Sequence, residues 1–180
     1  DSTSLVHPEH PEFPLVDSAP LTVFVEGNAY RDLAEIDSRM FTEMLDREAI
    51  ATSSQPPAGE FKRIYEEYPE DEIVVITLTQ RLSGTYESAH IATTQVENSE
   101  RITIIDSETL GAPLYEMVRR ASAMAQAGEM ASAIENMVNR LKKVARSYLA
   151  PTDFDFLMRG GRLSSRVASI GKVLRAIPIL

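Results

Sequence analysis

The 180-residue chain contains no cysteine and no tryptophan. Without cysteine it can form no disulfide, no thiolate metal site and no cysteine nucleophile. It also lacks any run of about 18 apolar residues, which excludes a transmembrane helix within these residues. Its 18 Lys and Arg residues are outnumbered by 27 Asp and Glu residues, so the formal net charge is −9. Such a chain is a poor match for nucleic acid and for anionic membrane surfaces, because both attract clustered basic residues.

Hydrophobic residues make up 43% of the chain, enough for a packed core. Two nearly continuous apolar runs, at 73–79 and 102–105, predict strands that are covered on both faces. Between them the sequence predicts a helix over 86–96, and two longer helices follow at 114–126 and 130–146. A strand, a helix and a second strand in this order predict an α/β fold, in which a parallel sheet is flanked by helices.

The remaining segments give weaker signals. Residues 21–31 predict a hairpin, and the apolar spacing of 39–47 predicts a helix. Residues 51–57, rich in Ser, Thr and Pro, predict a loop. A short strand at 148–150 and an amphipathic helix at 164–175 complete the prediction.

Hydroxyl side chains gather in three segments, at 1–3, 52–55 and 83–86. Ligands of parallel sheets bind beyond the carboxyl ends of the strands, which singles out the loops that carry Ser83 and Asp106. A hydroxyl beside free backbone N–H groups at a helix N-terminus can hold a carboxylate or a phosphate. The open alternative is that Ser83 only caps a helix and that Ser53 and Ser54 form a turn, since serine is a common capping residue.

The motifs of several enzyme classes are absent. A serine hydrolase needs a histidine base, but His7 and His10 lie in a proline-rich segment and His90 lies within a predicted helix. The sequence contains no G-x-S-x-G, no G-x-G-x-x-G and no P-loop motif. Histidine and carboxylate spacings typical of metal sites are also missing. The segment 160–162, Gly-Gly-Arg, is either a turn between helices or an anion contact.

Six segments occur in one order along the chain: D-S-T at 1–3, P-L-T-V at 20–23, T-S-S-Q-P-P at 52–57, L-S-G-T-Y-E-S-A at 82–89, L-M-R-G-G-R-L at 157–163 and P-I-L at 178–180. Together they resemble the motifs of the DegV family of bacterial fatty-acid-binding proteins. The resemblance implies a two-domain α/β protein that buries one long-chain fatty acid, such as palmitate or oleate, in an apolar tunnel. It implies no cofactor, no metal and no catalysis by the carrier itself.

The resemblance also assigns a binding site. Hydroxyls of the S-Q-P and S-G-T-Y segments would hold the fatty-acid carboxylate. The residues that carry over are Ser53, Ser54, Ser83, Gly84 and Thr85, with Thr52 and Arg162 as additional contacts. Arg81 departs from the small residue usual in the family and brings a cation close to the expected carboxylate.

Members of the family present the fatty acid to a partner kinase, whose acyl-phosphate product enters phospholipid synthesis. We therefore expect a fatty acid kinase subunit as partner, a cytoplasmic location, no nucleic acid partner and no stable membrane insertion. Residues 1–150 would form an N-terminal α/β domain, and 151–180 would begin a second, lipid-binding domain of a chain truncated at both ends. The alternative is a phosphotransferase or kinase-like enzyme acting on a small polyol, which would need a covalent histidine or a nucleotide–metal site.

Overall fold

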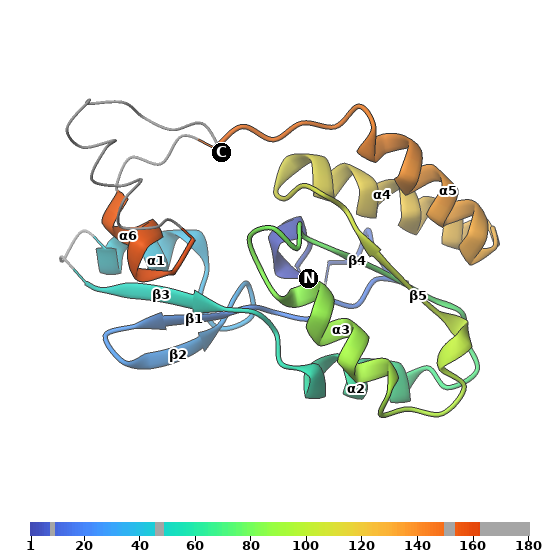
Figure 1. Cartoon of the computed structure of the whole chain (residues 1–180), viewed down its shortest axis with the longest axis horizontal. Helices are drawn as coiled ribbons and strands as arrows, with labels where there is room; N and C mark the ends of the chain where they lie inside the picture. The colour runs from blue at the N-terminus through green and yellow to red at the C-terminus, as the bar shows by residue number, and fades with distance from the viewer. Residues whose placement is uncertain (8–9, 46–48, 150–153, 163–180) are drawn as a thin grey trace.

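The computed structural model describes residues 1–7, 10–45, 49–149 and 154–162. The helix expected at 164–175 and the P-I-L segment lie outside these residues. Two sheets organise the described chain, one with the strand order β2-β1-β3 and the other with the order β4-β5. Figure 1 shows the two sheets side by side along the long axis of the molecule.

A parallel pair of strands forms the centre of the larger unit. Strand β4 (Ile73–Thr77) pairs in register with β5 (Ile102–Asp106), so that Ile73 lies opposite Ile102. The connection between them contains helix α3 (Thr85–Thr93) and the 3-10 helix η2 (Ser99–Arg101). This arrangement confirms the predicted strand–helix–strand unit of an α/β fold.

Helices cover both faces of this pair. Helix α2 (Ala58–Glu67) and α3 lie on one side, and α4 (Ala112–Gln126) and α5 (Ala131–Lys142) lie on the other (Figure 1). Ile73 and Val75 pack in the core with α2 and α3, whereas Val74 and Ile76 pack in the core with α4 and α5. Alternate strand residues point to opposite faces, so a continuous apolar run is what a doubly covered strand requires.

The smaller sheet is antiparallel. Its central strand β1 (Thr22–Val25) pairs with β2 (Asn28–Arg31) across the two-residue turn Glu26-Gly27, which confirms the predicted hairpin, and with β3 (Ala51–Ser54) on its other edge. A separate apolar core contains Val25, Ile36 and Ala51, joined by residues of helices α1 (Ser38–Leu45) and α6 (Phe154–Arg159). The 3-10 helix η1 (Ser2–Ser4) lies near the start of the chain.

Two predictions about local structure are wrong. Residues 51–54 form a strand instead of a loop, because β1 offers them a full row of backbone partners that the local sequence does not reveal. Tyr148 and Leu149 form no strand, and Tyr148 is exposed to solvent. The division of the chain at residue 150 stays a prediction; within the described residues, Phe156 of α6 packs in the core of the smaller sheet.

A cavity of about 740 Å³ lies along β4. Its walls come from the segment 10–19 and from α2, α4 and α5, and residues 73–76 line it from both faces of the strand. Because β5 occupies one edge of β4, the cavity follows the other edge.

Candidate functional site

The loops that follow β4 and β5 are tied together at the carboxyl end of the sheet. The backbone N–H of Thr79 donates to the carbonyl of Thr109 over 2.9 Å. The Asp106 carboxylate accepts from the backbone N–H of Glu108 at 2.9 Å and of Gln80 at 3.3 Å. The sequence therefore placed the Ser83 loop and Asp106 correctly at one edge of the sheet.

Two buried hydroxyls stand at the start of α3. The Oγ atom of Ser83 lies 2.9 Å from Oγ1 of Thr85, and the exposed fractions of the two residues are 8% and 0%. Gly84 is the N-cap residue of α3, and no side chain caps the helix. Ser83 therefore does not cap α3, contrary to the alternative in which its only role is helix capping. The first N–H groups of a helix have no intrahelical partners, so they and the two hydroxyls can serve an anion together.

The S-Q-P segment forms β3 and reaches the site from the smaller sheet. Ser53 lies opposite Val23 of β1, and Ser54 lies opposite Thr22. Because side chains alternate along a strand, Ser53 shares the face of buried Ala51, whereas Ser54 shares the face of Thr52. Ser53 and Thr52 are exposed, and Ser54 is half-buried. Ser53 and Ser54 therefore present their hydroxyls on opposite faces of the sheet.

Gln55 brings the two hydroxyl segments into contact. A Cβ atom built on Gly84 would lie 2.6 Å from Nε2 and 3.0 Å from Cδ of Gln55. Any larger residue at position 84 would therefore force the Gln55 side chain to shift. Gln55 was not predicted to belong to the site, although it lies inside the S-Q-P motif between two serines and two prolines.

Arg162 joins the same two segments through their backbones. Its Nε donates to the carbonyl of Leu82 at 3.2 Å, and its Nη1 donates to the carbonyl of Ser53 at 3.3 Å. Nη1 also donates to Gly160 at 2.6 Å. The guanidinium thus bridges β3 and the loop before α3. Among the described residues, no hydrogen-bond partner is found for Nη2, which leaves two N–H donors at this position.

The Gly-Gly-Arg segment is a helix end. The N–H of Gly161 donates to the carbonyl of Met158 and the N–H of Arg162 donates to that of Leu157. Gly161 has a φ of 74°, in the left-handed region. This pattern is a Schellman motif that ends α6 and aims the Arg162 side chain at the site.

The third hydroxyl-rich segment has a structural role. Thr3 donates to the Asp1 carboxylate, which also accepts from the backbone N–H of Leu78 at 2.7 Å. Ser2 donates to Asp32 at 2.7 Å.

The site therefore consists of the S-Q-P strand, the start of α3 and Arg162. None of these residues lines the cavity along β4.

The described residues contain no group of three or more His, Asp or Glu side chains that could hold a metal ion. None of their helices combines the length and the apolar character needed to cross a bilayer.

A family model for uncharacterised proteins of the DegV family matches residues 1–180. This chain belongs to the DegV family. Protein DegV of Bacillus subtilis is 35% identical over 188 residues, which cover 100% of this chain and 65% of the relative. The motif resemblance found in the sequence is confirmed.

Solved structures of DegV proteins share the fold. One comes from the study of fatty acid binding by a DegV family protein from Thermus thermophilus, and another is DegV, a fatty acid binding protein from Bacillus subtilis. Each has a TM-score of 0.79 and 29% identity, and the match covers 100% of this chain and 65% of the solved chain. The chain thus spans about two-thirds of the length of these DegV proteins.

Proposed function

We propose that this protein binds one long-chain fatty acid and holds its carboxylate with serine and threonine hydroxyls. The observation that carries the proposal is the meeting of the S-Q-P strand and the start of α3, which lie in contact at Gln55 and are bridged by Arg162. Two solved family members of similar fold are described as fatty acid binding.

The chemistry of the site suits a carboxylate. A buried carboxylate without partners is strongly unfavourable, so several donors must converge on it. Ser83, Thr85 and the N–H groups at the start of α3 offer donors from one side. Ser53 and Nη2 of Arg162, for which the described residues offer no partner, supply donors from the other side, with Ser54, Thr52 and the Gly84 backbone as further contacts. Because α3 presents its positive dipole end here, this position favours a negative group.

The acyl chain would supply most of the binding free energy. A chain of 16 to 18 carbons such as palmitate or oleate buries roughly 400–500 Å² of apolar surface, worth on the order of 10 kcal/mol before the cost of association is subtracted. In the proposed complex the chain occupies an apolar tunnel to which the second domain contributes. The amphipathic helix predicted at 164–175, whose apolar face would line part of this tunnel, lies outside the described residues.

We further propose that the protein is a cytoplasmic carrier and performs no chemistry itself. It presents the bound fatty acid to a fatty acid kinase subunit, which forms the acyl-phosphate used in phospholipid synthesis. This part rests on the motif resemblance. The polyol phosphotransferase alternative has no comparable support from a specific contact.

Mass spectrometry of an organic extract of the purified full protein tests the binding proposal. We expect a stoichiometric fatty acid in the wild-type extract and much less in the Ser53→Ala/Ser83→Ala variant. A protein that neither contains nor takes up palmitate or oleate contradicts the proposal. The carrier role predicts acyl-phosphate formation only when kinase, ATP and carrier are combined.

A further inference from the structure

The two halves of the site lie on different bodies. Ser53 belongs to the smaller sheet, whose strands and helix α1, residues 22–45 and 51–54, we call the cap. Ser83 and Thr85 belong to the unit of β4, β5 and α2–α5, which we call the body. Among the described residues, none in the apolar core of the cap belongs to either core of the body. Figure 1 shows the cap lying beside the body.

Polar contacts connect the cap and the body within the described residues. Nη2 of Arg31, on β2, lies 2.8 Å from Oε1 of Glu60, on α2. Ser2 lies in η1, which accepts a backbone hydrogen bond from Gly111 of the body at Thr3, and Ser2 donates to Asp32 of the cap at 2.7 Å. Arg162 spans the carbonyls of Ser53 and Leu82. Polar contacts of this kind break and re-form with far less cost than a shared apolar core, because water replaces the lost partners.

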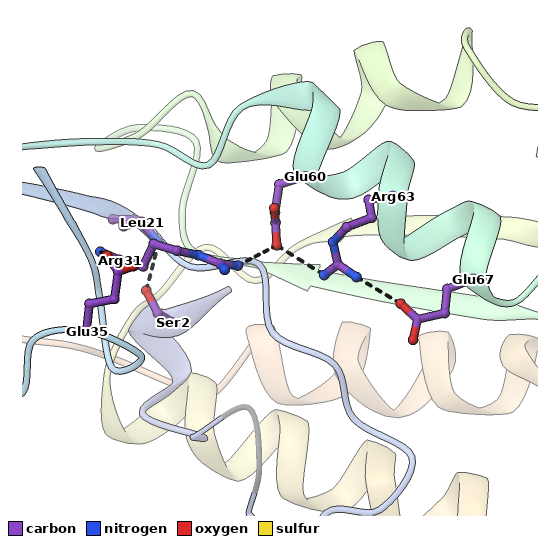
Figure 2. Close-up of polar contacts among 7 residues, drawn as sticks. All are labelled: Ser2, Leu21, Arg31, Glu35, Glu60, Arg63 and Glu67. Atoms are coloured by element: carbon purple, nitrogen blue, oxygen red, sulfur yellow. Dashed lines mark hydrogen bonds and ion pairs between the residues drawn. The ribbon is translucent and has the colours of Figure 1, made fainter.

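The Arg31–Glu60 contact can break without leaving either charge buried and unpaired. Oε1 of Glu60 also lies 3.1 Å from Nη2 of Arg63, whose Nη1 contacts Glu67 at 2.8 Å. Figure 2 shows this row of charges running along α2 and ending at Arg31. If Arg31 leaves, Glu60 keeps Arg63 as its partner, and the Arg31 side chain, already 50% exposed, is hydrated. Neither charge is then left buried and unpaired.

We propose that the cap is a gate over the hydroxyl site and that the Arg31–Glu60 ion pair is the latch that favours its closed position. Movement of the cap carries Ser53 and Ser54 away from Ser83 and Thr85, which opens the site for ligand entry and exit. The ligand part of this proposal rests on the proposed fatty-acid function, whereas the movement itself does not. Glu60 and Arg31 affect only the position of the cap and do not contact the ligand.

The movement can be measured without ligand because the chain has no cysteine. Spin labels on Ala29→Cys in the cap and Ser132→Cys in the body, both exposed, report the distance between the two bodies by electron resonance in the full protein. We expect Glu60→Gln to raise the open-to-closed ratio about two- to fivefold, the range for an exposed ion pair. Glu67→Gln is the matched control, since it removes only a contact within α2. An unchanged distance distribution in Glu60→Gln overturns the latch.

Exchange of bound fatty acid tests the gate. We expect Glu60→Gln and Arg31→Gln each to speed the release of palmitate about two- to fivefold. The double variant should be no faster than either single variant, because each substitution removes the same Arg31–Glu60 contact. Glu67→Gln should release palmitate at the wild-type rate. A shifted label distance with unchanged release overturns the gate role. A wild-type protein that binds no fatty acid overturns the proposed function alone, and the label distances still decide the latch.

Discussion

The side chain of Gln55 lies against the Cα atom of Gly84, so close that a Cβ at position 84 would sit 2.6 Å from Nε2 of Gln55. This contact joins the end of β3 to the first turn of α3. It brings the segment that carries Ser53 next to the segment that carries Ser83, although 30 positions separate these two residues in the sequence.

Gly84→Ala should weaken fatty-acid binding and change stability little. The new methyl displaces the Gln55 amide, which is the far end of a flexible side chain and can move. Gln55→Ala should weaken binding to a similar extent, and the double variant should be no worse than either single variant. Calorimetric titration with palmitate measures the affinity.

Gly59→Ala is the matched control for this pair. Gly59 lies in α2, where an added Cβ meets nothing within 4 Å. It should raise the free energy of unfolding by about 0.5–1 kcal/mol, because alanine is the better helix former. Palmitate affinity should stay at the wild-type value. Equal binding losses in Gly59→Ala and Gly84→Ala would contradict the steric explanation.

Ser83→Ala, alone or with Ser53→Ala, should weaken palmitate binding about tenfold or more without unfolding the protein. Each lost hydrogen bond to a charged carboxylate is worth about 1.5–3 kcal/mol. Ser54→Ala should have a smaller effect than Ser53→Ala, because the two side chains point to opposite faces of β3. Wild-type affinity in the Ser53→Ala/Ser83→Ala variant would refute the assignment.

Arg162→Lys should lower palmitate affinity about tenfold. An ammonium on a flexible stem keeps the charge but cannot bridge the carbonyls of Ser53 and Leu82 as the planar guanidinium does. Arg159→Lys is the control, since Arg159 only lies over the Phe156 ring on the exposed side of α6. Titration calorimetry of both variants decides the matter, and similar losses would show that general charge, instead of the bridge, matters.

Tyr65→Phe should lower the free energy of unfolding at pH 7 by about 1 kcal/mol. The Tyr65 hydroxyl, fully buried, donates to the Ala89 carbonyl at 3.2 Å and so connects α2 to α3. Tyr68→Phe, which removes an exposed contact to Asp17, should have little effect. Urea denaturation measures both changes.

The effect of Tyr65 depends on pH. Burial raises the pKa of Tyr65 above its ordinary value of 10.0. The unfolded chain therefore loses this proton first, and stability is lost as the pH rises from about 10 towards the folded pKa. The difference between wild type and Tyr65→Phe should shrink above pH 10, by up to about 1.4 kcal/mol per pH unit. A difference that stays constant from pH 7 to pH 11 would contradict the burial of this hydroxyl.

The sequence by itself determined the α/β unit and the family. The runs at 73–79 and 102–105 predicted buried strands because both faces of β4 and β5 are covered, so burial leaves a continuous apolar signal. The hairpin and the helices could also be predicted, because their apolar residues recur with the period of a strand or of a helix. The hydroxyl motifs pointed to Ser53 and Ser83 through their chemistry and order along the chain.

Only the tertiary structure decided how these parts meet. Strand β3 was missed because its residues are mostly polar and its pairing comes from β1, about 30 positions away. The contacts of Gln55 with Gly84 and of Arg31 with Glu60 leave no periodic signal, since each joins polar or small residues about 30 positions apart. Apolar patterns record which side chains leave water. They do not record which polar partners meet across two bodies, because many pairings satisfy the same charges and hydrogen bonds equally well.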